Sequence, residues 1–281
     1  MIKCWFDYKT VVVTGASSGI GKGLVKRLIK DHRCTVIGVA RNEKKIKALI
    51  EELGDDARLF TYSLFDVSER ENWENFAKDL IEKDVRIDVL INNAGVLPKF
   101  YKFANYTMED IEIAMQINFY SCVYSMRCML PLILQSPCGA IINVASSAAL
   151  CSLAGTSIYS ASKAALKSLT DSVREEYRKK CYIGLVWPGF TKTDIFHNQS
   201  KGDTGVKEKA LDIVSTNCER MVDDIIRGMW KKKDNMVFGI DARLMSIGNK
   251  TMGVKVSMIS SKVLEKAKLD MFRDVFTEHK K

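Results

Sequence analysis

The sequence predicts an α/β fold in which helices cover both faces of a doubly wound parallel sheet, in one domain with a helical C-terminal extension. Segments rich in Val, Ile and Leu alternate with helical patterns along the chain, which is the order that such a sheet requires. The 281 residues, 47% of them hydrophobic, suffice for one large core and are few for two.

The predicted elements follow one another without an internal repeat or a linker. The first half gives strand 10–14, helix 20–30, strand 34–40, helix 43–53, strand 58–64, helix 69–83 and strand 89–92. The second half gives a long helix 108–130, strand 140–144, helix 157–180, strand 182–187, helix 219–231, strand 236–239 and a helical tail. The first six strands are expected to form the doubly wound sheet.

A glycine-rich turn joins the first strand to the first helix. It consists of Gly15, Ala16, Ser17, Ser18, Gly19, Ile20 and Gly21. Glycine tolerates positive φ and lets the backbone approach a pyrophosphate, which then lies on the N–H groups of the helix start. A glycine triplet alone is weak evidence, but its place between a strand and a helix favours the dinucleotide site of a Rossmann fold over a purely structural turn.

The end of the second strand indicates which dinucleotide binds. An acidic residue there would hold the ribose hydroxyls of NAD, but the chain reads Ala40, Arg41, Asn42. The arginine fork suits a 2′-phosphate, so NADP(H) is the better fit, with Ser17 and Asn42 as helpers. The alternative is that Arg41 only caps the strand at the surface.

Two further segments are expected on the cofactor. The fourth strand runs into Asn92, Asn93, Ala94 and Gly95, whose small residues and side-chain amides suit a cofactor wall. Asp66, after the third strand, either meets the adenine amine or is an ordinary loop carboxylate.

Three side chains are candidates for proton chemistry. Tyr159 and Lys163 lie four positions apart and share one face of a predicted helix, and Ser146 follows the preceding strand. Lowering the pKa of a phenol from about 10 to about 7 requires roughly 4 kcal/mol, part of which a neighbouring ammonium can supply. Ser146 would donate a hydrogen bond to the oxygen that gains charge, whereas strand alternation would point Ser147 elsewhere.

With these motifs, Asn118 and the Pro188-Gly189 pair, the sequence closely resembles the short-chain dehydrogenase/reductase family over residues 8–195. The resemblance implies that Tyr159 is the general acid or base, that Ser146 polarises the carbonyl, and that Lys163 holds the nicotinamide ribose and lowers the tyrosine pKa.

The same resemblance gives Asn118 the support of a proton-relay water, although from the residues alone it could be a surface or packing Asn. The nicotinamide would be framed by Pro188, Gly189, Thr191 and Thr193.

Together with the preference for NADP(H) inferred from Arg41, the resemblance implies an oxidoreductase that moves a hydride between the nicotinamide and a carbonyl or secondary alcohol. The core would be 8–195, the substrate loop, helix and last strand 196–240, and the tail 241–281. A non-catalytic NADP(H)-binding sensor or scaffold is the alternative. Epimerase or dehydratase chemistry is a second one, which the glycine spacing and modest length disfavour.

The expected substrate is a lipophilic, steroid-like ketone or alcohol, covered by segment 198–208 and the tail. The pocket candidates are mostly apolar: Leu97, Phe100, Leu150, Cys151, Leu153, Phe190 and Phe196. Seven methionines follow residue 220, at Met221, Met229, Met236, Met245, Met252, Met258 and Met271. They either adapt to bulky apolar ligands or fill the core beneath the tail.

Charge and cysteine patterns set the remaining expectations. The net charge of +9 is spread over helix faces that also carry Glu and Asp, which argues against a nucleic-acid partner. The eight cysteines form no CxxC pair and only three histidines are present, so no metal is expected. Without an apolar stretch long enough to span a bilayer, a cytoplasmic enzyme is expected, and the family resemblance adds a homo-oligomer, a dimer or tetramer.

Overall fold

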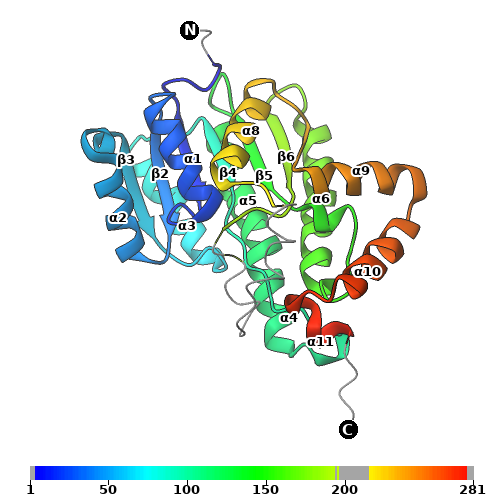
Figure 1. Cartoon of the computed structure of the whole chain (residues 1–281). Coiled ribbons are helices and arrows are strands. Elements are labelled where there is room, and N and C mark those ends of the chain that lie inside the picture. Colours follow the sequence, from blue (N-terminus) through cyan, green and yellow to red (C-terminus); the bar gives the residue numbers. More distant parts are fainter. Residues whose placement is uncertain (1–3, 194, 196–214, 277–281) are drawn as a thin grey trace.

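The computed structural model describes residues 4–193, 195 and 215–276, and it confirms the doubly wound parallel sheet (Figure 1). Within these residues the sheet has seven parallel strands in the order β3-β2-β1-β4-β5-β6-β7. They are β1 Thr10–Thr14, β2 Thr35–Ala40, β3 Phe60–Leu64, β4 Val89–Asn92, β5 Ala140–Val144, β6 Tyr182–Pro188 and β7 Asn235–Phe238. The order reverses between β1 and β4, and ligands bind such sheets in the crevice beyond the carboxyl ends of those strands.

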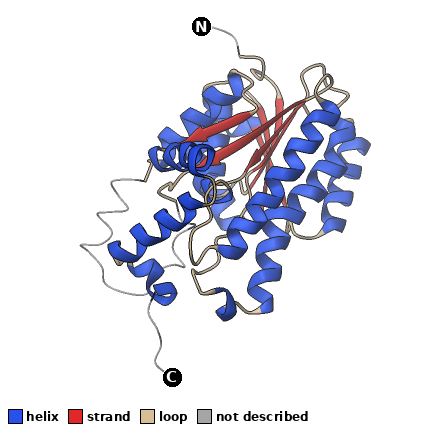
Figure 2. Ribbon diagram, turned by 90° about the vertical axis from the view of Figure 1, so that its right-hand side faces the viewer, coloured by secondary structure: helices blue, strands red, loops and turns tan. Residues whose placement is uncertain are grey.

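Helices cover both faces of this sheet (Figure 2). They are α1 Gly19–Lys30, α2 Glu43–Leu53, α3 Arg70–Glu82, α5 Ser121–Ile133, α6 Ser157–Tyr177 and α8 Cys218–Trp230, whereas α4 Met108–Met115 lies beyond the sheet and packs against α6. Val11 and Val13 of β1 pack in one apolar cluster with α1, α2 and α8, whereas Val12 packs in another with α3 and α5. This alternation follows from the period of two along a strand, and it buries β1 on both faces.

Beyond β7 the chain leaves the sheet as a helical arm, confirming the predicted tail. We call residues 240–276 the C-terminal arm; it contains α9 Ile240–Met252, α10 Lys255–Ala267, η6 Asp270–Phe272 and α11 Arg273–Phe276 (orange to red in Figure 1). The arm returns to the body where the ring of Phe272 stacks on that of Phe100, with centroids 4.7 Å apart. No helix within the described ranges is both long and apolar enough to cross a bilayer.

The predicted long helix differs most from the structure. Residues 108–133 form α4, a π-helical segment η3 (Gln116–Tyr120) that contains Asn118, and then α5. Such wide turns inside helices often mark functional sites. The predicted strand 58–64 begins only at Phe60, because residues Gly54–Leu59 form a 3-10 helix. Its first residue, Gly54, has φ of +57°. The other predicted boundaries shift by a few residues at most.

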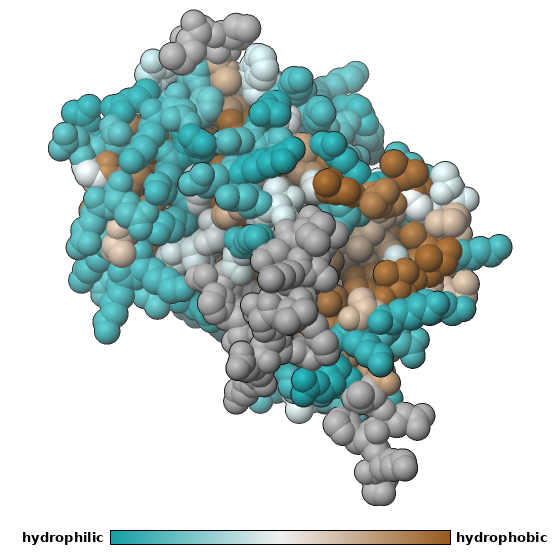
Figure 3. Space-filling view, viewed as in Figure 1, coloured by the Kyte–Doolittle hydropathy of each residue, from teal (hydrophilic) through white to brown (hydrophobic). Residues whose placement is uncertain are grey.

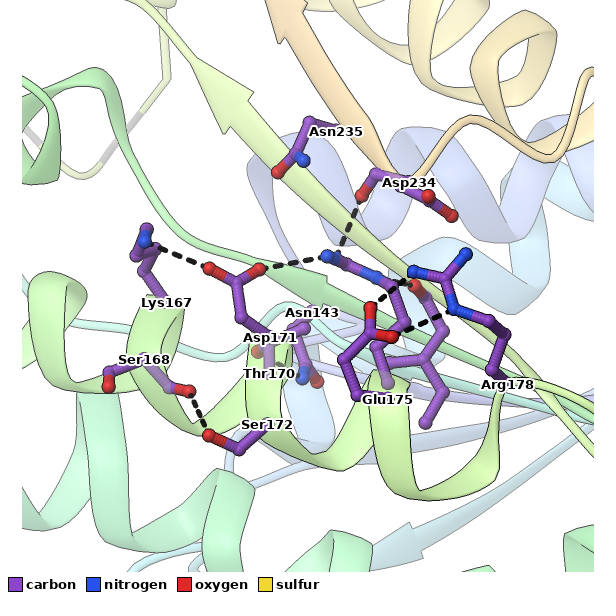
Figure 4. A network of polar contacts seen from close by, with 12 residues as sticks. Asn143, Lys167, Ser168, Thr170, Asp171, Ser172, Glu175, Arg178, Asp234 and Asn235 are labelled. Atoms are coloured by element: carbon purple, nitrogen blue, oxygen red, sulfur yellow. Dashed lines mark hydrogen bonds and ion pairs between the residues drawn. The ribbon is translucent and has the colours of Figure 1, made fainter.

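A buried arginine fixes α6, the helix that carries the predicted tyrosine–lysine pair. Arg174 donates from Nε to the carbonyl oxygen of Ile183 in β6 at 2.7 Å and from Nη2 to that of Asp234 at 2.9 Å. Its Nη1 also pairs with Asp171 at 2.8 Å, and Figure 4 shows Asp171 and Asp234 converging on this guanidinium. These contacts hold the C-terminal half of α6 against the sheet.

Candidate active site

The glycine-rich turn lies at the carboxyl end of β1 and is tightly closed. Gly15 and Gly19 have φ of +66° and +50°, which favour glycine. A Cβ on Gly21 would lie only 2.2 Å from the carbonyl oxygen of Gly15 and 2.5 Å from Nδ2 of Asn93. The hydroxyl of Thr14 accepts the N–H groups of Asn93 and the next residue at 2.9 Å each, so it joins this turn to the loop after β4. Sequence reasoning gave Thr14 no role.

The start of α1 fits the pyrophosphate of a dinucleotide. Its N-cap, Ser18, makes no side-chain cap hydrogen bond, and the first turn has no acidic residue. The start of α2 differs, because Asn42 caps it by accepting from the N–H of Lys45 and Glu43 lies in its first turn. The N–H groups of α1 are therefore available for an anion. The side-chain oxygen of Asn42, a predicted cofactor helper, caps α2, and its role toward the cofactor stays a prediction.

Arg41, predicted to select the dinucleotide, lies beside Asp66, predicted either to meet the adenine amine or to be a loop carboxylate. The exposed Arg41 donates from Nη1 to Oδ2 of Asp66 at 3.1 Å. The other oxygen of Asp66 accepts from the N–H of Ser68 at 3.0 Å and from its hydroxyl at 2.7 Å. Partial burial raises the pKa of Asp66, but the hydrogen bonds from Ser68 and Arg41 outweigh it and hold the pKa below its ordinary value. Ser17 is half-buried and is not among the cavity-lining residues.

Ser146, Tyr159 and Lys163 line one cavity of about 290 Å³ together with Gly15, Ser18, Gly19 and Ile20 of the glycine-rich turn. Ser146 follows β5, while Tyr159 and Lys163 lie in the first two turns of α6. The buried Lys163 donates from Nζ to the carbonyl oxygen of Val144 at 3.0 Å. Ser147 also lines the cavity; the 3-10 turn η4 (Ser147–Ala149) begins at this residue, so the strand alternation behind the expectation that it points elsewhere ends there.

Burial sets the protonation states of this trio. It raises the pKa of the Tyr159 phenol, and a hydrogen bond with Ser146 offsets only part of that rise. Burial also lowers the pKa of the Lys163 ammonium. The predicted lowering of the phenol pKa by Lys163 is not seen in this arrangement, since desolvation dominates. Tyr159 is therefore a neutral phenol near pH 7, poised to donate a proton.

Asn118 is fully buried beside this trio. Its Oδ1 accepts from the N–H of Val96 at 2.8 Å, and its Nδ2 donates to the carbonyl oxygen of Val96 at 2.9 Å and to the hydroxyl of Ser162 at 3.2 Å. A Cβ on Gly95 would lie 3.1 Å from Oδ1 of Asn118 and 3.4 Å from Nζ of Lys163. Asn118 thus connects the loop after β4 to α6, which excludes the surface interpretation; its relay role stays a prediction.

Asn92 lies outside the cavity, contrary to the predicted cofactor contact. Its Nδ2 donates to Oδ1 of Asn143 at 2.9 Å, and its own Oδ1 accepts from the hydroxyl of Ser125 at 2.7 Å. Its side chain points into the core because it is still part of β4. The cavity is lined instead by the following residues, Asn93, Ala94 and Gly95.

The loop after β6 brings the predicted nicotinamide frame to the cavity: Pro188, Gly189, Thr191 and Thr193 all line it. Asp241, in the first turn of α9, accepts the N–H of Phe190 on Oδ2 at 2.7 Å. A Cβ on Gly189 would lie 2.0 Å from Oδ1 of Asp241. Burial raises the pKa of Asp241 despite the N–H from Phe190. Sequence reasoning missed Asp241, for which the only signal is its place just after Gly239.

Part of the cavity wall belongs to one apolar cluster. Of the predicted pocket residues, those that line the cavity are Leu97, Phe100, Leu153 and Phe190, and the structure adds Ile195 and Met245. Leu150 and Cys151 are not among the residues that line it, and each packs in an apolar cluster. Phe196 and segment 198–208 lie outside the described residues.

The seven methionines after residue 220 occupy three kinds of position: the core, the cavity wall and the surface. Those buried in the core are Met221, Met229, Met236 and Met271. Met245 lines the cavity, whereas Met252 and Met258 are exposed on the C-terminal arm.

One group of metal-binding side-chain types comes together at the opposite, amino-terminal edge of the sheet. Ligand atoms of Cys4, Asp7 and His32 lie within 4.8 Å of one another. Asp7 already hydrogen-bonds the N–H of Cys4 at 2.7 Å and Nδ1 of His32 at 2.8 Å. Hydrogen bonding accounts for this cluster, and the expectation of no metal stays a prediction.

Known proteins share both the sequence and the fold. A model of the short chain dehydrogenase family matches residues 9–204. A benzil reductase ((S)-benzoin forming) of Saccharomyces cerevisiae is 34% identical over 213 residues, which cover 73% of this chain and 80% of that protein. An 11-beta-hydroxysteroid dehydrogenase-like protein of Arabidopsis thaliana is 32% identical over 225 residues, with coverages of 79% and 70%.

Among solved structures, the closed form of a serine dehydrogenase complexed with NADP+ has a TM-score of 0.70 and 28% identity, covering 78% of this chain and 88% of its own. Since the family model alone matches well over half of the sequence, this chain belongs to the short-chain dehydrogenase/reductase family of oxidoreductases.

Proposed function

We propose that this chain is an NADP(H)-dependent oxidoreductase that transfers a hydride between the nicotinamide and a lipophilic ketone or hydroxysteroid-like alcohol. The observation that carries the proposal is the single cavity in which the start of α1 meets Ser146, Tyr159 and Lys163. An anion-binding helix start and proton donors in the same cavity are what a hydride carrier and a carbonyl substrate need.

The chain's own residues handle the proton and the developing charge. The bound dinucleotide supplies the hydride. Ser146 donates a hydrogen bond to the substrate oxygen, and Tyr159 delivers its phenolic proton to that oxygen as the carbonyl becomes an alcohol. Lys163 would hold the ribose, and Asn118 would support the water that reprotonates Tyr159. A neutral phenol can donate the proton that the reductive step needs.

NADP(H) is favoured over NAD(H) by the charge at the end of β2. Arg41 is exposed there, and the preceding Ala40 supplies no carboxylate for a ribose 2′-hydroxyl. The related serine dehydrogenase is complexed with NADP+, which agrees with this choice.

The apolar part of the cavity wall favours a lipophilic substrate. This part includes Leu97, Phe100, Leu153 and Met245, and such walls select bulky apolar groups. The names of the two sequence relatives, a benzil reductase and a hydroxysteroid dehydrogenase-like protein, point to substrates of this kind. A homo-oligomer through α4, α5 and α6 stays a prediction, supported by the exposed Met108 and Ile113 of α4.

The decisive test is Tyr159→Phe in the full chain, assayed by NADPH oxidation with bulky ketones and by NADPH affinity. We expect turnover to fall by about 100-fold or more while cofactor affinity is kept, because only the proton donor is lost. The control is Tyr106→Phe, another buried tyrosine, whose hydroxyl donates to the carbonyl oxygen of Gly155 at 2.7 Å. Near-normal turnover by Tyr159→Phe refutes the assignment, and NADPH binding by the wild type without turnover of any ketone favours a sensor.

A further inference from the structure

The C-terminal arm carries a dense group of exposed apolar side chains. Among the described residues, 17 large hydrophobic side chains are exposed, and eight of them lie within residues 240–263. They are Ile240, Leu244, Ile247, Met252, Val254, Met258, Ile259 and Val263, which we call the arm patch. Figure 3 shows hydrophobic surface gathered over α9 and α10 on the right of the molecule.

The polarity of the arm helices is the reverse of that of a water-facing helix. On α9, Ile240, Leu244 and Ile247 follow at i, i+4 and i+7 and form one exposed stripe. The stripe belongs to a preformed helix pair, because α9 and α10 pack so closely that a Cβ on Gly248 would lie 2.6 Å from Cγ2 of Val256.

On α10 the serines face the body while apolar side chains face outward. The hydroxyls of Ser257 and Ser260 each lie 3.7 Å from Sγ of Cys151, and that of Ser261 accepts the N–H of Ala154 at 3.1 Å. The outer side carries Met258, Ile259 and Val263. Soluble surface helices normally place these residue types the other way round.

The charge around the arm patch indicates what covers it. Six basic residues are exposed on α9, α10 and the residue that follows: Arg243, Lys250, Lys255, Lys262, Lys266 and Lys268. Glu265 is their one exposed acidic neighbour between residues 240 and 268. A second copy placed on this face by a two-fold axis would bring both basic sets together, whereas anionic lipid headgroups complement them.

We propose that the arm patch docks the protein onto an anionic lipid bilayer, with α9 and α10 lying in the headgroup region. Apolar side chains flanked by lysines, on helices that do not span, are the features of such interfacial binding. Because Met245 of α9 lines the cavity, docking would also bring lipid beside the substrate site. That consequence for a lipophilic substrate rests on the proposed function.

The test is co-sedimentation of the full chain with vesicles of phosphatidylglycerol mixed with phosphatidylcholine, and with phosphatidylcholine alone. We expect binding to the mixed vesicles that weakens with salt and is much weaker without the anionic lipid. Leu244→Glu should weaken it at least about tenfold. The matched control is Ile81→Glu on α3, which is 63% exposed against 64% for Leu244, carries the same charge change and should leave binding unchanged.

The lysines are tested separately. The double variant Lys255→Gln/Lys262→Gln should weaken vesicle binding about 25-fold, at about fivefold for each charge removed. The control double variant Lys78→Gln/Lys83→Gln, on α3 and its C-cap, should bind vesicles like the wild type. Absence of vesicle binding, or equal binding by Leu244→Glu and Ile81→Glu, overturns the proposal. The proposal is also overturned if the protein does not bind vesicles and Leu244→Glu changes its oligomeric mass. That result would show that a second copy of the chain covers the arm patch. Vesicle binding is independent of turnover, so this result does not depend on the enzymatic proposal.

Discussion

Arg41→Ala should weaken the binding of NADPH far more than that of NADH. A guanidinium that donates to a phosphate contributes about 1.5–3 kcal/mol, which corresponds to about 10–150-fold in Kd. In the structure Arg41 is paired with Asp66 at 3.1 Å while remaining 63% exposed. Breaking an exposed pair of this kind costs about 0.2–1 kcal/mol, so the pair is a weak competitor for a phosphate.

The same energies predict the effects of two other substitutions, one at Asp66 and one that replaces Arg41 by lysine. Asp66→Asn should tighten NADPH binding by at most about fivefold, because it only releases Arg41 from that pair. Arg41→Lys should fall between wild type and Arg41→Ala, since it keeps the charge but loses the fork. Isothermal titration with NADPH and NADH measures all of these. Equal losses for both dinucleotides in Arg41→Ala, or no loss at all, would refute the reasoning.

Three further substitutions test the glycine-rich turn, the buried Lys163 and the contacts of Arg174 that hold α6 against the sheet. Gly21→Ala should abolish tight NADPH binding because its Cβ collides with backbone, whereas Gly23→Ala in the same helix meets only the tip of a valine and should keep affinity in the same titration. Lys163→Met should abolish turnover, and its free energy of unfolding relative to that of the wild type should fall as the pH rises. The change removes the hydrogen bond to the carbonyl oxygen of Val144 at every pH and relieves the cost of the buried charge. The folded-state pKa of Lys163 lies below its ordinary 10.5, so that cost is full below the folded pKa and vanishes above 10.5, and a difference in urea unfolding that stays constant with pH would contradict this. Arg174→Met should cost about 2–4 kcal/mol in the same urea assay by leaving buried carbonyls unpaired, while the exposed Arg178→Met should leave stability unchanged; equal effects of the two would contradict the anchor.

Local patterns sufficed for the order of the strands and helices along the chain and for the class of sheet. Two features needed more than periodicity. The wide turn contains Asn118, whose amide pairs with both backbone groups of Val96, and periodicity does not report such a contact between segments 22 residues apart in sequence. The arm's outward apolar face was invisible in the sequence, since apolar spacing predicts a buried stripe and cannot say which side the body occupies.

The candidate site divides in the same way. Positions defined by backbone geometry, such as Gly15, Gly21 and Gly189, could be predicted because few residue types fit them. Positions defined by side-chain direction were harder: Asn92 and Asn93 are adjacent, yet only Asn93 lines the cavity. Asp241 accepts a hydrogen bond from the N–H of Phe190, which lies 51 residues earlier in the chain. A local sequence pattern cannot predict a contact over that separation.

The central claim, hydride transfer from NADPH to a carbonyl carbon, is tested most directly by isotope tracing. NADPH deuterated at the transferable position of the nicotinamide is incubated with the full chain and a bulky ketone, and the alcohol product is analysed by mass spectrometry and NMR. The account predicts one deuterium on the carbinol carbon of the product, and product formation slower by about 100-fold or more with Tyr159→Phe. An alcohol without deuterium at that carbon, or no alcohol from any bulky or small ketone despite NADPH binding, would contradict it.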